Sequence, residues 1–455
     1  MIRSLLNYIN DNLRFRDHLK RIEIYREFES SSYSAKKERQ FESLANMLKY
    51  AQNNIIYYKE ISCFDKFSQN EFSNIPLLTK QIIREKFSNL INPEVPAEKN
   101  TSGGSTGEPV VLLQCKNFRN WTSARIAYIG KKTGKEFHPK ILRVWGSQRE
   151  ILEQSGNLRE RARLIFKKIK LLNSFKMTQK DIRDFVQVIN HFKPQIIHAY
   201  VQSIYEICKY INQHEKAIFI PKAIIVSAGT CYGFMENEIR KAFPCPLVNV
   251  YGSREVSGIA ISCDGSDLLH VNMLTQYVEI VDDFGKPVPD GTPGNIVITS
   301  LTNKAMPLIR YEIGDRGIKS PLQKCPRCGW EGDIIEKVIG RSHDVLKNVN
   351  GDIIYGGFLT SLLYFREWLK KFQIVQEKET LLTFKVVLAE DVKSIPEFDK
   401  KEIVDSINKV FPNCDVDWQV VDDIVYDKSG KFRYIISKLN SENERKLMDD
   451  AHLSS

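Results

Sequence analysis

The chain has 455 residues, which is longer than a single hydrophobic core usually grows, so at least two domains are expected. Hydrophobic residues make up 42% and charged residues 27% of it, a composition that excludes a disordered or fibrous protein. The formal net charge of +10 comes from scattered lysines and arginines, which indicates a solvated exterior with pockets for phosphates rather than a nucleic-acid-binding surface.

The N-terminus lacks the continuous apolar segment that a secretory signal needs. The least polar stretch, Ile353 to Phe365, is too short to cross a bilayer and contains Gly356 and Gly357. The nine cysteines are mostly solitary, as is typical of reduced thiols. We therefore expect a cytoplasmic protein without a transmembrane helix.

The first part of the chain is expected to be helical. Up to about Glu60, apolar and charged residues alternate at helical spacing. Lys80 to Phe87 predicts a further helix, which Pro76 and Thr79 introduce.

From Ile141 to Val250, β-rich runs alternate with helical segments, which predicts α/β layers with parallel strands. The predicted strands are Ile141 to Trp145, Ile196 to Tyr200, Ala223 to Ser227 and Leu247 to Tyr251, and the predicted helices are Gln179 to Phe192 and Glu236 to Phe243. Beyond His270, strands at Gln276 to Val281 and Gly294 to Thr299 with turn residues between them predict an antiparallel, barrel-like subdomain.

The end of the chain is expected to form a small lid. Predicted strands at Leu381 to Val387 and Val416 to Val421 flank a predicted helix at Glu402 to Phe411. The predicted fold class is therefore α/β: a large N-terminal domain of layered α/β sheets with the barrel-like subdomain, residues 1–340, and a small mobile α+β C-terminal domain, residues 341–455.

The first candidate motif is the loop Thr101-Ser-Gly-Gly-Ser-Thr-Gly-Glu-Pro-Val110. Its glycines let the backbone turn tightly, and its hydroxyl and N–H groups can face phosphate oxygens. No Gly-Lys-Ser/Thr closes it, so it is not a Walker loop. In isolation, a plain flexible loop explains it equally well.

The second motif, Val250-Tyr-Gly-Ser-Arg-Glu255, follows an apolar run and so lies where a strand ends. Ligands of open α/β sheets bind at that edge. Glu255 is suited to a Mg²⁺ ion held between ATP phosphates. The alternative is a helix that Ser253 caps, with Glu255 exposed.

Three further motifs follow. Pro307-Leu-Ile-Arg-Tyr-Glu-Ile-Gly-Asp315 delivers an aspartate that can accept hydrogen bonds from both ribose hydroxyls, or simply forms a Gly-Asp turn. Gly340-Arg-Ser-His-Asp344 supplies an arginine and a candidate hinge, or is a polar linker. Lys428-Ser-Gly-Lys-Phe-Arg433 is a basic turn, which alone reads as a solvated hairpin.

In this order and spacing, the five motifs resemble those of the adenylate-forming superfamily of acyl-CoA synthetases, luciferases and peptide-synthetase adenylation domains. The resemblance runs from Thr101 to Arg433, and it is strongest to the phenylacetate-CoA ligase branch, including the related enzymes of capsular-polysaccharide gene clusters. It implies an ATP- and Mg²⁺-dependent enzyme that converts a carboxylic acid into an acyl-AMP and passes the acyl group to an acceptor.

The resemblance also implies roles for individual residues. The phosphate loop would comprise Ser102, Gly103, Ser105, Thr106 and Gly107, and the adenine and acyl sites would be lined by Ser227, Ala228 and Gly229. The remaining nucleotide contacts would be made by Tyr251 stacking on adenine, Gly252 and Ser253 beside the phosphates, Glu255 on Mg²⁺, Asp315 on the ribose and Arg341 behind it.

Lys431 would serve the first half-reaction, in which a carboxylate attacks the α-phosphate. A mobile ammonium between these two anions offsets their repulsion in the transition state. The C-terminal domain would then rotate about a hinge at Asp344 to admit the acceptor.

Two departures from the family pattern concern nucleotide binding. Glu108 and Val110 stand where many members have lysines, so ATP affinity is weakened unless other basic residues compensate. The segment Ser227-Ala-Gly-Thr lacks the acidic residue often found there.

Cys263, His270, Cys325 and Cys328 form a candidate metal site. They are the ligand types of a closed structural zinc site, and the last two form a C-x-x-C knuckle before Gly329. Zinc would pin the barrel-like subdomain to the nucleotide loop. The alternative is a set of reduced surface thiols.

The acceptor stays open between CoA and an amine, and in the second case the chain would be an amide synthetase that modifies a capsular or cell-surface sugar. Trp121, Tyr128 and Trp145 would form an apolar acyl wall if they face inward, but core burial is the expected fate of each. Two other classes are a zinc-containing nucleic-acid binder and a catalytically inactive scaffold.

Overall fold

The computed structural model describes the residues 2–61, 72–102, 110–132, 139–145, 164, 168–174, 177, 179–229, 231–341, 345–363, 366, 368–424 and 434–439. For 2–15, 130–132, 340, 341, 345, 353, 355, 357 and 361 it describes the backbone alone.

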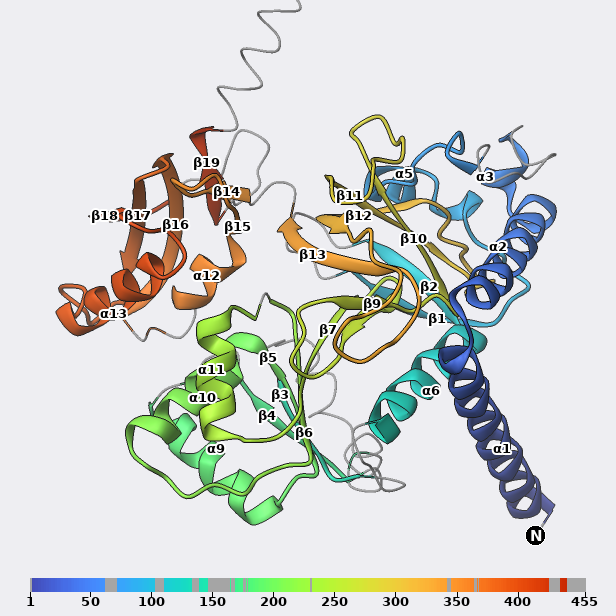
Figure 1. Ribbon diagram of the computed structural model, residues 1–455, viewed down its shortest axis with the longest axis horizontal. Coiled ribbons are helices and arrows are strands. Elements are labelled where there is room, and N and C mark those ends of the chain that lie inside the picture. The colour runs from blue at the N-terminus through green and yellow to red at the C-terminus, as the bar shows by residue number, and fades with distance from the viewer. Residues whose placement is uncertain are drawn as a thin grey trace, which may run out of the picture.

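The described part of the chain is organised around an 11-stranded sheet (Figure 1). Its strand order is β10-β11-β12-β13-β9-β8-β7-β6-β5-β3-β4. The strands are β3 (Ile141–Trp145), β4 (Ile169–Asn173), β5 (Ile196–Tyr200), β6 (Ala223–Ser227), β7 (Leu247–Ser253), β8 (Ser257–Ser262), β9 (Leu269–Val271), β10 (Gln276–Val281), β11 (Pro293–Ser300), β12 (Tyr311–Lys319) and β13 (Ile334–Arg341).

One half of this sheet, from β4 to β7, is parallel, as the alternating pattern predicted. Its strands are runs of β-branched and other apolar residues, typical of strands buried on both faces. The covering helices are α9 (Gln179–Phe192), α10 (Val201–Gln213) and α11 (Gly233–Ala242). The carboxyl ends of β5, β6 and β7 therefore share one edge, where ligands of α/β sheets bind.

The other half runs from β7 through β8, β9, β13, β12 and β11 to β10 at the far edge, and it is antiparallel. The antiparallel pairing expected for the barrel-like subdomain is present, and the pairing of β7 with β8 joins these strands to the parallel half in one 11-stranded sheet. β12 can pack closely against β11 because Gly317 has no Cβ. A Cβ at this position would lie 2.8 Å from the Ile296 side chain.

The N-terminal segment is helical, as predicted. Its helices are α1 (Ile2–Ser30), α2 (Tyr33–Asn54), α3 (Ile56–Lys59), α5 (Lys80–Glu85) and the short η2 (Phe87–Asn89). Thr79 caps α5 by accepting a hydrogen bond from the Ile82 N–H at 3.2 Å. The hairpin of β1 (Ala97–Thr101) and β2 (Val111–Cys115) follows, and α6 (Lys116–Lys132) packs against α1.

The C-terminal part has its own sheet, of order β18-β17-β16-β19. Its elements are β14 (Val345–Lys347), β15 (Ile353–Tyr355), α12 (Gly357–Leu363), β16 (Leu369–Lys378), β17 (Leu381–Leu388), α13 (Glu397–Asn408), β18 (Asp415–Val420) and β19 (Ile435–Ser437). The predicted helix at Glu402 to Phe411 begins earlier, because Glu397 and Asp399 occupy a favourable acidic first turn after Pro396. The domain boundary at residues 340 and 341 falls at the end of β13 and stays a prediction.

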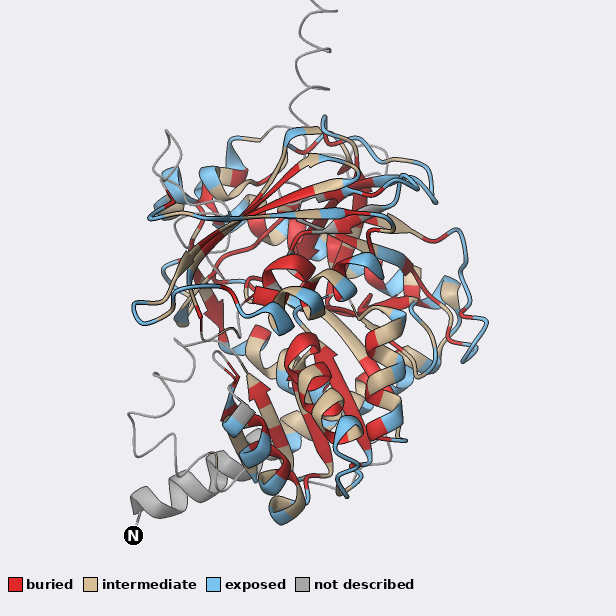
Figure 2. Ribbon diagram, turned by 90° about the vertical axis from the view of Figure 1, so that its left-hand side faces the viewer, coloured by how far each residue is buried: buried red, intermediate tan, exposed pale blue. Residues whose placement is uncertain are grey.

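Figure 2 colours the buried residues red along the ribbon. Two large hydrophobic cores run through the described residues, besides a small cluster of Cys115, Phe118 and Ala305. One joins the antiparallel half to the N-terminal helices. The other joins the parallel half to the C-terminal part, where the rings of Tyr232 and Phe358 lie 5.1 Å apart. A polar contact reinforces this junction, because Lys209 and Arg366 both pair with Glu402.

None of the helices in the described ranges combines the length and apolarity of a membrane span.

Candidate functional site

The β1–β2 hairpin closes the base of the predicted phosphate loop. The Ser102 N–H donates to the Val110 carbonyl at 2.9 Å, and the Val110 N–H donates to the Ser102 hydroxyl at 2.9 Å. Ser102 is therefore buried and fixed at the first position of the loop. Gly103, Ser105, Thr106 and Gly107 lie outside the described residues.

The same hairpin holds the turn that carries the second motif. Asn100 and Gln114 both donate side-chain hydrogen bonds to the carbonyl of Arg254, at 3.2 and 2.8 Å. Gln114 also lies within 3.4 Å of the Glu255 carbonyl. The loop base and the turn at residues 254–256, which are far apart in the sequence, are thus fastened to each other.

Glu255 is buried in this turn, with 5% of its surface exposed. Its carboxylate accepts a hydrogen bond from the Tyr311 hydroxyl at 3.4 Å. The alternative in which Ser253 caps a helix and Glu255 is exposed is wrong, since a turn follows Ser253 and β8 follows the turn. Ser253 instead accepts a hydrogen bond from the Val256 N–H at 3.4 Å.

Tyr251 and Asp315 meet across the sheet. The Tyr251 hydroxyl donates to an Asp315 carboxylate oxygen at 2.8 Å. Asp315 is half-buried on β12 and pairs in register with Arg341 on β13. The structure therefore brings the predicted adenine, ribose and domain-junction residues to one place, although it describes only the backbone of Arg341.

Ser227, Ala228 and Gly229 lie at the carboxyl end of β6, next to β7. Ala228 has a φ of +59°, in the left-handed region that non-glycine residues rarely adopt. Such strain, which costs of the order of 1–3 kcal/mol, concentrates at functional edges. Gly252, on the neighbouring β7, cannot carry a side chain, because a Cβ would lie 2.7 Å from the Ser257 carbonyl.

Trp145, one of the three candidates for an acyl wall, belongs to an aromatic cluster at this edge, and its partners Tyr200 and His198 were missed in the sequence. Trp145 ends β3 and Tyr200 ends β5, and their rings lie 4.4 Å apart. His198 lies 5.0 Å from the Trp145 ring and 3.5 Å from the Ser227 hydroxyl. The available signal was positional, since each aromatic residue is the last residue of a parallel strand.

The Trp145 indole N–H is buried and has no acceptor among the described residues, so it can donate to a bound acid. Trp121 and Tyr128 have the expected different fate. Both pack against Tyr25 of α1, at 5.6 and 5.8 Å between ring centroids.

A cavity of about 860 Å³ adjoins the phosphate-loop base. Asn100, Gln114 and Ser253 line it together with three basic residues, Lys116, Arg119 and Arg254. Asp17 and Glu98 also line this cavity, and Glu98 forms an ion pair with Arg119.

Lys431 and Asp344 lie outside the described residues, so their predicted roles stay predictions.

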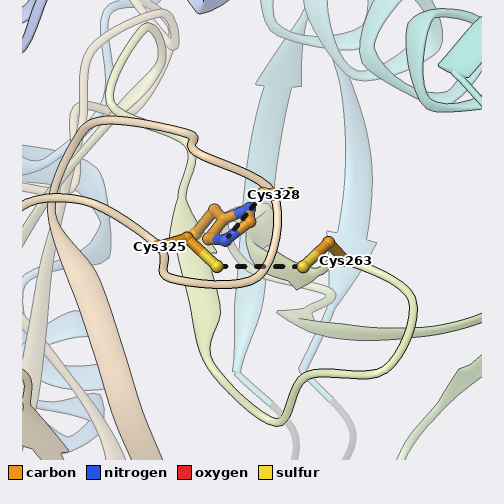
Figure 3. Close-up of side chains that lie close together, drawn as sticks. Cys263, Cys325 and Cys328 are labelled. Carbon is orange, nitrogen blue, oxygen red and sulfur yellow. Dashed lines mark hydrogen bonds between the residues drawn. The ribbon is translucent and has the colours of Figure 1, made fainter.

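The four candidate metal ligands converge (Figure 3). Their ligand atoms all lie within 4.8 Å of one another, with 3.8 Å between the Cys263 and Cys325 sulfurs and 3.9 Å between the Cys328 sulfur and His270 Nε2. Two thiolates on one tetrahedral zinc are separated by about 3.8 Å, so this donor set fits a closed structural site. His270 also stacks on Trp330 at 4.5 Å.

The thiols of this cluster differ in acidity. Burial raises the pKa of Cys263 to about 12, and hydrogen bonds with Cys328 and Cys325 add to this. Burial also acts to raise the pKa of Cys325, but hydrogen bonds from the backbone and from the other two thiols outweigh it, so its pKa is lowered. The knuckle turn itself is closed by hydrogen bonds between Cys325 and both Gly329 and Trp330.

Comparison with known proteins relates the chain to ligases. Residues 346–438 match the CapK C-terminal domain family. The chain is 24% identical over 405 residues to Protein CapK of Staphylococcus aureus, covering 86% of each chain. It is 24% identical over 329 residues to a phenylacetate-coenzyme A ligase of Thermus thermophilus, covering 69% of this chain and 70% of the relative.

Solved structures give the same fold. A 2-hydroxyisobutyryl-CoA ligase in the postadenylation state, in complex with R3-HIB-AMP, aligns with a TM-score of 0.63 at 16% identity over 94% of both chains. The same ligase in complex with 2-HIB-AMP and CoA in the thioesterification state aligns with a TM-score of 0.57 over 93% of this chain and 94% of that one. The predicted α/β fold class is thereby confirmed.

Proposed function

This chain is a homologue of CapK and of the phenylacetate-CoA ligases, with the fold of the adenylate-forming superfamily, and on that premise we propose that it is an AMP-forming ligase. It activates a carboxylic acid with ATP to an acyl-adenylate and transfers the acyl group to an acceptor. One observation carries the proposal: the hairpin that bears the phosphate loop is hydrogen-bonded to the turn of Glu255, beside the Tyr251–Asp315 pair.

Glu255 fits the role of Mg²⁺ ligand. It is a buried carboxylate at the base of the phosphate loop, and Mg²⁺ takes one or two protein carboxylates together with phosphates and water. When bound, the ion supplies charge neutralisation for the departing pyrophosphate. The Tyr311 hydroxyl orients the carboxylate, and Gln114 fixes the backbone behind it.

Asp315 holds the ribose in this proposal, and the Tyr251 hydroxyl fixes the rotamer of its carboxylate. Tyr251 thereby keeps its ring at the edge where adenine stacks. Arg341 is assigned to the ribose as well, because its backbone pairs with Asp315 in register on the neighbouring strand.

The acid occupies the edge formed by Ser227 and the aromatic cluster. Trp145 and Tyr200 supply an apolar wall, and the buried Trp145 N–H supplies a hydrogen-bond donor. Attack of the acid on the α-phosphate joins two anions, and the ammonium of Lys431 neutralises their encounter.

The test is carboxylate-dependent pyrophosphate exchange with Mg²⁺ and ATP across a library of acids. At least one acid should stimulate exchange. Lys431→Ala should lower the rate by about 10²- to 10³-fold, because it removes a charge needed mainly in the transition state. Lys428→Ala, in the same basic motif, is the matched control and should retain most activity. Equal rates for Lys431→Ala and the wild type would remove that lysine from the mechanism.

Two acceptors are considered, CoA and the amine of an amino sugar. The phenylacetate-coenzyme A ligases among the relatives favour CoA, and the resemblance to the capsule-related branch favours a sugar amine. Offering each acceptor to the acyl-adenylate formed from the active acid, and analysing the products by mass spectrometry, distinguishes a thioester from an amide.

We further propose that Cys263, His270, Cys325 and Cys328 hold a structural zinc ion. Four protein ligands leave no position for a substrate, so the role of the ion would be structural. It would join the segment after β8 to the connection between β12 and β13.

Reduced thiols and ATP dependence support a cytoplasmic location. The proximity of the described residues Ser102, Glu255 and the Tyr251–Asp315 pair speaks against the nucleic-acid binder and against an inactive scaffold.

Metal analysis tests the zinc site. Protein purified without chelator should contain about one zinc per chain, because the site is closed by four ligands. Cys325→Ser should lose the metal and unfold at a lower denaturant concentration. Cys231→Ser, which alters a half-buried thiol outside the cluster, should keep both properties. A zinc-free wild type of unchanged stability would refute the site.

A further inference from the structure

A second cavity lies away from the nucleotide edge, between helices α1 and α6 on one side and β7 to β9 with the cysteine knuckle on the other. Its volume is about 930 Å³, within the range of small-molecule sites. None of the residues predicted above to bind the nucleotide lines it. It is therefore a separate candidate site.

Arg125 of α6 lines this cavity and is only 7% exposed. Its Nη1 atom is buried and has no hydrogen-bond partner among the described residues. The guanidinium lies directly against the backbone of β8, because a Cβ at Gly258 would be 2.0 Å from Nη1. Glycine at 258 thus makes room for this arginine.

Arg310 shows what a buried arginine with a structural role looks like in the same protein. It is 1% exposed and donates to the Glu279 carboxylate and to the carbonyls of Ser73, Ile75 and Gly285. Arg125 has no comparable set of acceptors. A buried guanidinium without acceptors is costly, so a group that accepts its hydrogen bonds would be bound strongly.

The acidic residues around the cavity are already engaged. Glu29 accepts a hydrogen bond from the Trp330 indole at 2.6 Å. Asp264 pairs with Arg240 at 2.8 Å, and Glu331 pairs with Lys324 at 3.3 Å. Glu29 interacts with the charge of Arg125, but no carboxylate among the described residues hydrogen-bonds to the guanidinium. An added carboxylate would match the planar guanidinium with two parallel hydrogen bonds.

The remaining walls indicate the rest of the ligand. Tyr128, Val248, Ile261 and Trp330 present aromatic and aliphatic surface to the cavity. Tyr25 also lines it, and burial raises the pKa of its hydroxyl, which stays protonated as a donor. Among the described residues, Arg125 is the only lysine or arginine that lines the cavity, whose other walls combine apolar residues with serines, Asn272 and three acidic side chains. One cation beside these acidic groups suits a singly charged carboxylate group on an apolar body better than a phosphate.

We propose that this cavity binds a small carboxylate with an aromatic or aliphatic body, and that Arg125 pairs with the carboxylate group. Two sources share this chemistry. The ligand is either a distal carboxylate of the acid that the enzyme activates, an option that rests on the proposed function, or a separate effector acid.

The test is calorimetric titration of the full-length, metal-loaded protein with benzoate and phenylacetate, and with the neutral amides benzamide and phenylacetamide. An acid should bind at least about tenfold more tightly than its amide, because an ionised partner strengthens the hydrogen bonds. Arg125→Met should lose that binding event, and Arg125→Lys should retain part of it. Arg21→Met, which removes a nearby charge outside the cavity, should bind as the wild type does.

Stability gives a second readout that a purely structural arginine would not satisfy. Without ligand, Arg125→Met should be at least as stable as the wild type, since no hydrogen bond is lost. Strong destabilisation, or acid binding that survives Arg125→Met unchanged, would overturn the proposal.

Titration with 5′-AMP present distinguishes the two sources of the ligand. An altered acid affinity indicates the substrate, and an unaltered affinity indicates an effector. Pyrophosphate exchange tests the ligase function independently.

Discussion

The two halves of the large sheet are stabilised in different ways. The parallel half relies on apolar strands covered by helices α9 to α11. The antiparallel half buries polar groups as well. They include the Arg310–Glu279 pair, His270 and Cys325 of the ligand cluster, and Asn303, which links the β1–β2 hairpin to the segment before β12 through Leu113 and Met306.

This difference matches the positions of the candidate site residues. Asp315 and the Tyr311 that orients Glu255 belong to the polar, antiparallel half, where directional bonds fix geometry. The parallel half offers an edge lined by Trp145 and Tyr200, and it carries the C-terminal part on its helices. The antiparallel half, which hydrogen bonds fix, thus adjoins a parallel half whose contacts are mainly apolar and non-directional.

Breaking the buried ion pair should have the largest effect. Arg310→Met should lower the free energy of unfolding by about 3–5 kcal/mol, because it leaves the Glu279 carboxylate buried without its partner. Urea denaturation measures this change. The double variant Arg310→Met/Glu279→Leu should recover most of the loss. A loss of less than about 1 kcal/mol in the single variant would show that the pair does not stabilise this half.

Glu255, which lies in the turn between β7 and β8 and contacts Tyr311 of β12, should matter for catalysis rather than for stability. Glu255→Gln should lower pyrophosphate exchange about a hundredfold, because the amide is a poor Mg²⁺ ligand. The free energy of unfolding should change by less than about 1 kcal/mol, because glutamine still accepts the Tyr311 hydrogen bond. A large loss of stability with normal specific activity would reverse this interpretation.

Weakening the junction between the parallel half and the C-terminal part should have the smallest effect. Glu402→Gln weakens contacts with Lys209 and Arg366, and partly exposed pairs of this kind contribute about 0.5–1 kcal/mol. Distance measurements between spin labels on the two sides should show about two- to fivefold more of the separated form. Glu397→Gln, on the same helix but largely exposed, is the control and should leave the distances unchanged.

The sequence predicted four of the five parallel strands, because each of these is an apolar run bounded by turn residues. It did not predict β4, whose short run Ile169–Asn173 contains a lysine and ends in asparagine. It also placed Tyr251 and Glu255 near the end of a strand, whereas Asp315, expected in a Gly-Asp sequence that a strand delivers, lies in the middle of β12. The continuation of one sheet through β8 and β9 was not predictable in this way. Short, non-local pairings such as β9 with β13 leave little trace in local periodicity.

The burial of charged residues was the other feature that could not be predicted from the sequence. Arg310 lies in the motif that carries Asp315, and nothing in its sequence neighbours indicates that it is 1% exposed. Arg125 is equally inconspicuous on α6. Arginine is usually exposed, so composition predicts the surface, and only the three-dimensional contacts reveal the exceptions.

The reciprocal hydrogen bonds between Ser102 and Val110 have a consequence for how nucleotide preference can change. They anchor both ends of the loop to a hairpin that is itself fastened to the Glu255 turn. Substitutions between the two anchors can therefore retune phosphate recognition without disturbing the scaffold. Restoring lysines at 108 and 110 would be a graft of this kind, although the second would also have to preserve the anchor at Val110.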